Sequence, residues 1–460
     1  MTSFLLGVIS KLRGLILRDD TMTGSRSNDA VENMNYLIIT ANVGTLFEDP
    51  EGIQNVWMEE VFKVVKERQP HLIAMHCQEI GGKDYKSSME PVKEFFDKLM
   101  SSEALNEFVI VRGYLDGDFD HVDQYTALGN IYFVHKSVNN AMLFNYTSGE
   151  FEDVSEKKVF SKDIPKLSCV KKEKFEQNFF PDCRWSRKGY CRVRWRINGQ
   201  VIEFVNIHLF HDDNNLVSIK SSPSPYTSYR KRALKFVLNR LQEESPCRDG
   251  VSFVCGDFNF RLDVKSLVQK LCPASKQQVV RAPTEEEEVI RVVYRNGESE
   301  STDDEASVTN GNEESTSDEV LVKIEKKVFE VEQSLLRPNS SYSHLRRFDL
   351  EPNDVEGKLM EFDVSFPPTY PFSEDTSNGE GYMDTRCPSW CDRILLTQDS
   401  WDWIHSQENH GNAVYDTIGS NVCMGDHKPV YLAFTAAAQK PDEPVPEDKA
   451  QSSTTDEATT

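Results

Sequence analysis

The sequence predicts an α/β fold, because short apolar runs rich in β-branched residues alternate with amphipathic segments. Residues 36–43 (YLIITANV) form such a run and predict a buried strand. Residues 53–68 carry apolar side chains at helical spacing, and residues 71–80 (HLIAMHCQEI) form a second apolar strand. The chain has 460 residues, of which 38% are hydrophobic. This length allows one large α/β domain with appendages, or two smaller domains.

The remaining elements continue this alternation of strands and helices along the chain. No run of about 18 apolar residues occurs, so we expect no membrane-spanning helix. The expected strands are 128–135, 191–197, 201–209, 251–260 and one near 430–435, and the expected helices are 229–243, one from Ser266, and 319–335.

Both ends of the chain and one internal segment differ in composition from the body. Residues 1–18 place apolar side chains at helical spacing among Lys and Arg, a pattern typical of a helix on an anionic membrane surface. A helix packed on the domain and a frayed end are the alternatives. Residues 296–319 are acidic and poor in large apolar residues, which predicts a disordered insertion. The predicted division is an amphipathic segment 1–18, a linker 19–35, a domain 36–438 that contains the insertion, and a disordered tail 439–460.

The chain is strongly acidic, with 75 Asp+Glu against 52 Lys+Arg and a formal net charge of −23. An acidic body repels polyanions, so we expect no nucleic-acid partner. A small anionic substrate would still bind if basic side chains gather in one pocket. The ten cysteines show neither a disulfide framework nor two pairs with zinc spacing. This pattern favours a reduced, cytoplasmic protein, with peripheral contact at the plasma membrane through residues 1–18 as a further expectation.

Polar residues that can hold a cation or a phosphate follow several of the expected strands. Taken singly, each is weak evidence: Glu79 could be a surface residue that ends a strand, His208 a core histidine, and Asp426 the start of a turn. The whole set, on strands that otherwise lack charge, indicates a site at the strand ends. In chain order the set is Asn42, Glu79, His208, Asp257, Asn259, Asp426 and His427.

Several motifs resemble those of the inositol polyphosphate 5-phosphatases, a family within the fold shared by DNase I-like endonucleases and exonucleases. The resemblance runs from about Tyr36 to Phe434, and it is strongest with the type I branch. The family motifs are TANVG (40–44), CQE (77–79), NIHL (206–209), GDFNFR (256–261), PSWCDRIL (388–395) and GDHKP (425–429). The type I stretches are WSRKG (185–189), NIHLFHD (206–212), FPPTYPFSED (366–375) and NVCMGDHKP (421–429).

The resemblance implies a four-layer α/β sandwich of two mixed β-sheets packed face to face, with Mg²⁺ as cofactor. Hydrolysis of a phosphate monoester needs charge neutralisation on the phosphoryl oxygens and a positioned water. Glu79 is the best candidate ligand, because Mg²⁺ prefers hard oxygen donors and binds through few carboxylates. Asn42 would support this metal site, and Asp426 would lie beside the metal or the phosphate.

The other catalytic roles also follow from the resemblance. Asp257 would activate the attacking water, and Asn259 would orient that water or hold a phosphoryl oxygen. His208 and His427 would stabilise the charge on the phosphoryl group. Asp392 would hold His427, a carboxylate–imidazole pair that favours the charged ring.

Substrate choice is expected to depend on residues that bind the phosphates not cleaved. Arg386 and Tyr370 match the family positions that grip the 4-phosphate, and a guanidinium suits bidentate phosphate binding. Arg187 and Lys188 in WSRKG add positive charge for the 1-phosphate or the scissile one. The alternative for this pair is an ordinary solvated turn.

Two departures from the family pattern bear on the substrate and on anchoring. Members that act on membrane phosphoinositides have a Lys after the Tyr, where this chain has Pro371. The resemblance therefore favours the soluble compounds Ins(1,4,5)P3 and Ins(1,3,4,5)P4 as substrates. The expected cellular role is then the termination of calcium signalling. The chain ends in DEATT without the prenylated Cys box of type I enzymes. We therefore expect no prenylation, and the segment 1–18 could take its place.

Two other classes of function compete with this interpretation. A nuclease of the same fold would share the metal, water-activating and histidine residues, but would lack Arg386, Tyr370 and PSWCDRIL. A non-catalytic protein that sequesters inositol phosphates would have lost a metal or water-activating residue, and here none is missing.

Overall fold

The computed structural model describes the greater part of the chain. The predicted segment 1–18, most of the linker 19–35, nearly all of the insertion 296–319 and the tail 439–460 lie outside the described residues. Within the described part no helix is both long and apolar enough to span a membrane, and every cysteine is a free thiol. The described residues are 33–82, 89–181, 183, 186–244, 250–283, 287–296, 319–338, 341–355, 357–406 and 413–437.

The first β-sheet is mixed and has the strand order β17-β18-β1-β2-β4-β3-β7. Its centre is the parallel pair β1–β2, which is connected by a helix, while β18 pairs antiparallel with β1. Its strands are β1 Asn33–Asn42, β2 Leu72–Gln78, β3 Phe108–Leu115, β4 Gly129–His135, β7 Lys157–Phe160, β17 Val414–Thr417 and β18 Val430–Ala437.

The second β-sheet has the order β16-β11-β10-β9-β5-β6, with β8 also paired to β9. It is mixed as well, since β10 and β11 are parallel and β16 is antiparallel to β11. Its strands are β5 Ala141–Asn145, β6 Glu150–Asp153, β8 Lys171–Lys174, β9 Gly189–Ile197, β10 Gln200–His208, β11 Val251–Asp257 and β16 Asp392–Leu396.

Helices cover the outer faces of both sheets, and the longest ones begin at capped prolines. The side chain of Asp49 accepts from the Gly52 amide at 3.0 Å, so α1 begins at Pro50 and not at residue 53 as expected. Ser224 caps α4 in the same way, which moves its start from the expected residue 229 to Pro225. The α-helices are α1 Pro50–Arg68, α2 Met89–Met100, α3 Asn215–Lys220, α4 Pro225–Glu243, α5 Val264–Leu271, α6 Gln333–Leu336 and α7 Gln398–His405.

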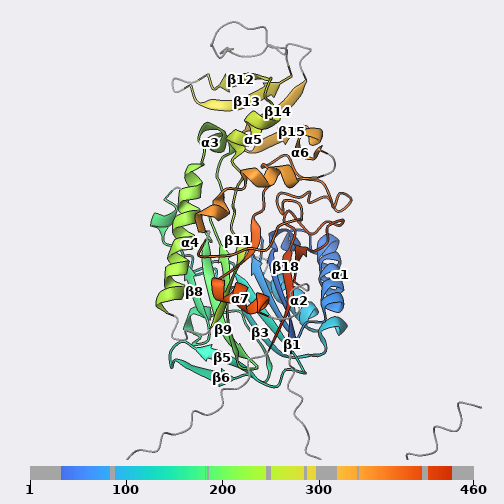
Figure 1. The fold of residues 1–460 in the computed structure, drawn as a ribbon, viewed down its shortest axis with the longest axis vertical. Helices are drawn as coiled ribbons and strands as arrows, with labels where there is room; N and C mark the ends of the chain where they lie inside the picture. The colour runs from blue at the N-terminus through green and yellow to red at the C-terminus, as the bar shows by residue number, and fades with distance from the viewer. Residues whose placement is uncertain are drawn as a thin grey trace, which may run out of the picture.

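The two sheets pack face to face across the main hydrophobic core. Along β1, Tyr36 and Ile38 point into the cluster shared with Phe204 and Phe253 of the second sheet. The alternate residues of β1 instead belong to the cluster beneath α1 and α2, and α4 covers the outer face of the second sheet. Figure 1 shows these layers with α4 on one side and α1 on the other. The predicted four-layer α/β sandwich of two mixed sheets is confirmed.

A third, four-stranded sheet was not anticipated, and it replaces the helix predicted at 319–335. Val322 and Ile324 are buried and alternate with Lys323 and Glu325, and this period of two suits a strand with one buried face. Val322 and Ile324 are buried in the cluster that contains side chains of α3 and α5, and α6 keeps only the end of the predicted helix. The strands are β12 Lys276–Arg281, β13 Val289–Arg295, β14 Val320–Glu325 and β15 Val328–Val331, in that order.

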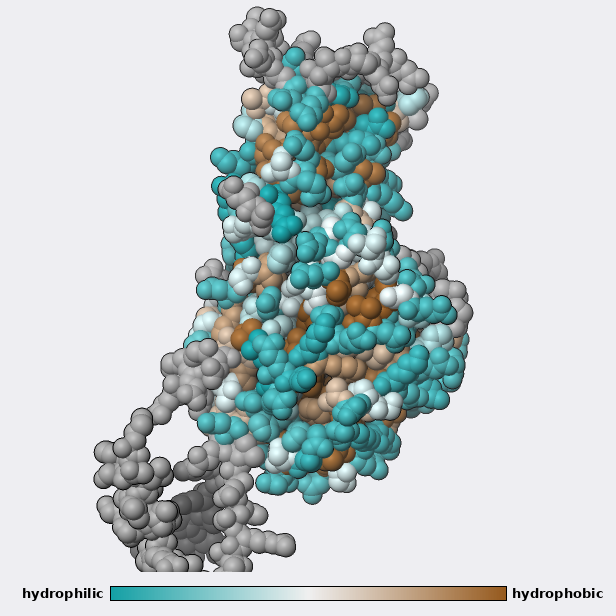
Figure 2. All heavy atoms as spheres, turned by 90° about the vertical axis from the view of Figure 1, so that its right-hand side faces the viewer, coloured by the Kyte–Doolittle hydropathy of each residue, from teal (hydrophilic) through white to brown (hydrophobic). Residues whose placement is uncertain are grey.

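This third sheet, which we call the inserted sheet, forms one end of the molecule (Figure 1). Figure 2 shows apolar side chains at that end among hydrophilic ones, and Ile290 and Val320 are among the exposed large hydrophobic residues.

A polar bridge between the two main sheets lies beside the ends of β2 and β10. Gln78 donates from Nε2 to Oδ1 of Asn206 at 2.7 Å. The Asn206 amide nitrogen in turn donates to the Cys77 and Gly129 carbonyls and to Oδ1 of Asn130, at 2.9–3.2 Å. Both bridging residues are fully buried, so each needs these partners. The bridge therefore fixes how the two sheets meet at this edge.

We expect Asn206→Ala to lower the free energy of unfolding by about 1–3 kcal/mol, because Gln78 and Asn130 would lose a buried partner. Urea denaturation followed by circular dichroism measures this change. The control is Asn178→Ala, which removes an exposed side-chain amide that donates to Glu176 and should change stability by less than about 0.5 kcal/mol. Equal stability of the two variants would contradict a structural role for the bridge.

Candidate active site

The registers of three neighbouring strands bring three of the expected residues into one row. His208 lies opposite Asp257 in the β10–β11 pair, and Asp257 lies opposite Asp392 in the β11–β16 pair. Asp257 Oδ2 is 3.1 Å from His208 Nε2. Gly256 permits the close approach of β10, because a Cβ at this position would lie 1.9 Å from the Ile207 carbonyl oxygen. Strand pairing therefore sets the spacing of these side chains.

The first sheet contributes Asn42 and Glu79 from the ends of its parallel strands. Asn42, the last residue of β1, donates from Nδ2 to Asp257 Oδ2 at 3.2 Å. Glu79 follows β2 with φ of 56°, a left-handed conformation that is uncommon outside glycine. Its Oε1 lies 3.7 Å from His208 Nε2 and 3.6 Å from Lys188 Nζ. Groups from both sheets thus meet at one edge.

Positive neighbours keep the carboxylate of Glu79 ionised. Burial raises the pKa of Glu79, yet the net effect lowers it to about 2. The cause is the positive charge of Lys188, His208 and Arg187, which outweighs burial. Glu79 is therefore a charged oxygen donor across the physiological range.

Asp257 is also held in its charged form, although it is almost completely buried. Burial raises its pKa, but the hydrogen bond with His208 and the charges of His208, His427 and Lys188 lower it well below the usual range. Burial, and then Lys188, lower the pKa of His208 itself. His427 and Lys188 are the other cations whose charge acts on Asp257.

Two groups of side chains could hold a divalent cation. Asp257, Asp392 and His427 offer ligand atoms that lie within 4.8 Å of one another. Asp392 and His427, however, are already hydrogen-bonded to each other. The carboxylate of Glu79 is 28% exposed and ionised, and its Oε2 and the Asn42 Oδ1 both lie beside Gly44. This hard-oxygen set is open to a hydrated cation and fits Mg²⁺ better.

The last expected catalytic pair, Asp392 and His427, is brought into direct contact. His427 Nδ1 lies 2.8 Å from Asp392 Oδ2, which also accepts from Thr369 Oγ1 at 2.7 Å. The ring of Tyr370 packs on the imidazole with centroids 4.5 Å apart. Burial lowers the pKa of His427, but Asp392 and Asp426 outweigh it and raise the pKa to about 10. The ring is therefore positively charged at neutral pH.

Asp426 lies at the side of this group, in contact with Thr45. The Thr45 hydroxyl lies 3.0 Å from Asp426 Oδ1 and 3.0 Å from Glu374 Oε1. Burial raises the pKa of Asp426, and the attraction of His427 is offset by repulsion from Glu79 and Glu374. The place of Asp426 next to the charged groups is thus shown, while its role stays a prediction.

Asn259 is held at both ends of its amide. Its Nδ2 donates to the Leu209 carbonyl at 3.1 Å, and its backbone amide donates to Asp257 Oδ1 at 2.9 Å. Its Oδ1 accepts from Arg261 Nη2 at 2.5 Å. The side chain is therefore fixed next to the carboxylate that is expected to activate the water.

Arg261 is a candidate functional residue to which the sequence assigned no role. It is buried, it stacks over the Tyr370 ring at 4.7 Å, and it orients Asn259. Its Nε has no hydrogen-bond partner among the described residues. The only signal in the sequence was its place at the end of GDFNFR, two residues after Asn259.

Arg187 and Lys188 both reach the catalytic groups. Arg187 donates from Nη1 to the Gly82 carbonyl at 2.9 Å, and its Nη2 lies 3.7 Å from Glu79 Oε2. Lys188 is buried and hydrogen-bonded to His208. A buried ammonium argues against the alternative of a solvated turn.

Arg386 and Tyr370 lie together, but the Arg386 guanidinium faces the surrounding loops. Its Nη1 and Nη2 donate to the side chain of Asn215 and to nearby backbone carbonyls at 3.2–3.4 Å. Its charge still acts on Tyr370 and Arg261, so it lies near both of them. Binding of a 4-phosphate by Arg386 therefore stays a prediction.

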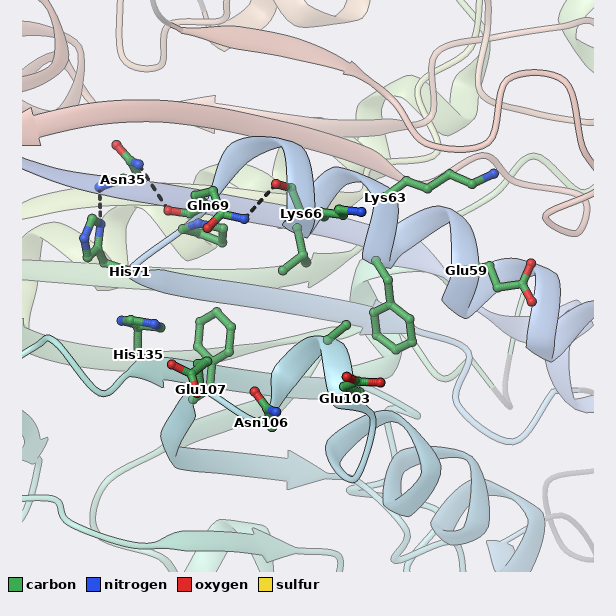
Figure 3. A pocket seen from close by; sticks show the side chains of 15 residues that line it. Asn35, Glu59, Lys63, Lys66, Gln69, His71, Glu103, Asn106, Glu107 and His135 are labelled. Carbon is green, nitrogen blue, oxygen red and sulfur yellow. Dashed lines mark hydrogen bonds between the residues drawn. The ribbon is translucent and has the colours of Figure 1, made fainter.

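A groove at the other end of the first sheet contains none of these residues. It has a volume of about 660 Å³ and lies where β1 and β2 begin (Figure 3). His71 and His135 line it, with ring centroids 6.0 Å apart, together with Phe62 and Phe108. The expected catalytic residues are thus gathered at the opposite edge of this sheet.

Comparison with known proteins adds relatives to this geometry. Residues 326–433 match the model of endonuclease/exonuclease/phosphatase family 2. Inositol polyphosphate-5-phosphatase A of Rattus norvegicus is 44% identical over 403 residues, which cover 87% of this chain and 93% of that protein. The probable type I inositol 1,4,5-trisphosphate 5-phosphatase of Caenorhabditis elegans is 35% identical over 425 residues, 87% of this chain and 99% of that protein.

Among solved structures, the inositol polyphosphate 5-phosphatase domain of Spsynaptojanin aligns with 88% of this chain and 84% of that chain, at 14% identity and a TM-score of 0.47. Both matches to the relatives above cover more than nine-tenths of the relative's length. The chain therefore belongs to the inositol polyphosphate 5-phosphatase family.

Proposed function

We propose that this chain is a Mg²⁺-dependent phosphatase that removes the 5-phosphate from Ins(1,4,5)P3 and Ins(1,3,4,5)P4. The observation that carries the proposal is the meeting of Glu79, Asp257 and the Asp392–His427 pair at one edge of the two sheets. Family membership supports a phosphatase over a nuclease of the same fold. The presence of every expected catalytic side chain supports an enzyme over a protein that only sequesters its ligand.

Asp257 is the group suited to accept a proton from the attacking water. It is ionised, and its Oδ1 accepts a hydrogen bond from the backbone amide of Asn259, which fixes the carboxylate. The Asn259 side chain, held by Leu209 and Arg261, provides a rigid second contact for the water. Proton transfer to a positioned base typically contributes 10²–10⁴-fold to a rate.

The charge that develops on the phosphoryl oxygens would be met by fixed positive groups. His427 is charged and buried, its Nδ1 is taken by Asp392, and its Nε2–H has no hydrogen-bond acceptor among the described residues, so it can donate to a phosphoryl oxygen. Lys188 and Arg187 add positive charge from the other side. Mg²⁺ held by Glu79 and Asn42 would supply further charge neutralisation when bound. Such prearranged donors act strongly in a site that excludes bulk water.

The preference for soluble substrates rests on Pro371 and on the relatives. Pro371 takes the place at which lipid-acting members have a Lys. The worm relative is named for inositol 1,4,5-trisphosphate, a soluble compound. Hydrolysis of this messenger would end the calcium signal that it triggers.

The assay that tests this function measures phosphate release from Ins(1,4,5)P3, Ins(1,3,4,5)P4 and PtdIns(4,5)P2, with Mg²⁺ and with EDTA. We expect Mg²⁺-dependent release from the two soluble compounds only. Asp257→Asn, which keeps the shape but removes the base, should lower kcat by about 10²–10⁴-fold. Strong release from the lipid would contradict the substrate choice, and full activity of a folded Asp257→Asn variant would contradict the assigned base.

The pH dependence of the reaction should reveal the Asp392–His427 pair. Asp392 raises the pKa of His427 to about 10, so the wild-type ring stays charged up to that pH. In Asp392→Asn burial still lowers the pKa of the ring, and we expect the alkaline limb of kcat/KM to move down by about 1–3 pH units. An exposed control, Asp416→Asn, should leave the profile unchanged. An unmoved limb in the Asp392→Asn variant would show that His427 does not need its charge.

We further propose that the protein is cytoplasmic and makes peripheral contact with the plasma membrane through residues 1–18. The support is the basic amphipathic pattern of that segment. Deletion of residues 1–18 should move the protein from the membrane fraction to the soluble fraction without changing kcat on soluble substrate. Identical partitioning of both forms on vesicles with anionic lipid would contradict this anchor.

A further inference from the structure

The turn between β14 and β15 of the inserted sheet lies at the rim of the active site. The Lys326 carbonyl accepts from the Asn215 amide at 3.2 Å and from Arg386 Nη1 at 3.4 Å. Asn215 also donates from Nδ2 to the Thr385 carbonyl at 3.0 Å. In Figure 1 the inserted sheet lies beyond the end of β11, the strand that ends in Asp257. These hydrogen bonds tie the turn to the segment that leads into PSWCDRIL.

The turn presents two lysines, Lys326 and Lys327, and both are exposed. No carboxylate within the described ranges forms an ion pair with either ammonium group. Lys323, by contrast, pairs with Glu330 across the same two strands at 3.3 Å. Two unpaired cations are notable at this place in a chain with a net charge of −23. Their ammonium groups are therefore available to bind an anionic group of a ligand at this side of the site.

We propose that Lys326 and Lys327 form a subsite for the 3-phosphate of Ins(1,3,4,5)P4. This inference deepens the function proposed above and rests on it. The ligand class is an inositol ring that carries vicinal phosphates at positions 3, 4 and 5, and the turn selects for the first of these.

The order of the contacts along the rim supports this subsite. His427 lies where the 5-phosphate is cleaved, and Tyr370 packs on it at 4.5 Å. The charge of Arg386 acts on Tyr370, and Arg386 is the residue expected to bind the 4-phosphate. The lysine turn is next to Arg386, because the Lys326 carbonyl accepts a hydrogen bond from the Arg386 guanidinium. Around the inositol ring the next carbon after C5 and C4 is C3. A ring placed with its 5- and 4-phosphates at the first two places thus turns its 3-phosphate toward the lysines.

The inserted sheet also explains why the lysines are held in place. The Phe329 amide donates to the Asp384 carbonyl at 2.9 Å, so β15 is fastened to the chain just before Arg386. A second contact joins Asn215 Nδ2 to the Glu325 carbonyl at 3.3 Å. Because the turn is tied on both sides, its side chains lose only their own rotamer freedom when they bind.

The test is a double variant, Lys326→Gln with Lys327→Gln, assayed by steady-state kinetics on Ins(1,4,5)P3 and Ins(1,3,4,5)P4. We expect KM for the tetrakisphosphate to rise roughly three- to tenfold, as for the loss of two exposed charge contacts. KM for the trisphosphate should change by less than about twofold, and kcat should stay the same for both. The matched control is Lys270→Gln with Lys276→Gln, which removes the same charge from exposed positions on α5 and β12.

An equal rise in KM for both substrates, or no rise for either, would overturn the subsite. Ins(4,5)P2, which lacks the 1-phosphate, serves as a third substrate. If the double variant raises KM for Ins(1,4,5)P3 but not for Ins(4,5)P2, the lysines bind the 1-phosphate, and the proposal is overturned as well. The wild-type enzyme separates this result from the proposed function: absence of release from every substrate would overturn that function itself. If the wild type cleaves only the trisphosphate, the inhibition constant of the tetrakisphosphate as a competitor replaces its KM.

Discussion

The hydrogen bond between Gln78 and Asn206 is the constraint on which the active site depends. It joins two separate sheets at a fully buried position, where a slip would leave amide groups without partners. Glu79 directly follows Gln78, and His208 lies two residues beyond Asn206. Aligning the bridge therefore aligns the ends of β2 and β10, and it brings a carboxylate from one sheet to an imidazole from the other.

Charge balance imposes the second constraint at this edge. The buried carboxylate of Asp257 and the partly exposed one of Glu79 are both kept ionised by the cations that lie against them. Lys188 meets both needs, since its charge acts on each carboxylate. The same arrangement concentrates positive charge in a chain that is acidic overall, so the site can attract a polyanion that the rest of the surface repels.

The sequence predicted those parts of the protein that depend on local pattern. Polar residues that end apolar strands were recognised, and Glu79, His208 and Asp257 do lie together. Two features were out of reach. The contacts of Arg261 depend on how distant segments fold over it, and the inserted sheet was taken for a helix at 319–335. In that segment Lys and Glu residues of high helix propensity hide the alternation of apolar and charged residues that is typical of a strand. Burial of the apolar side chains against α3 and α5 favours the strand over the helix.

The groups proposed to act in catalysis and the groups proposed to select the substrate lie on different parts of the fold. The groups expected to act on the scissile phosphate stand at strand ends, where the registers of β10, β11 and β16 fix their distances. The groups at the rim, Arg386 and the Lys326–Lys327 turn, belong to loops and to the inserted sheet and are tied by hydrogen bonds to backbone carbonyls. A change in the rim therefore leaves the pairing of the central strands intact.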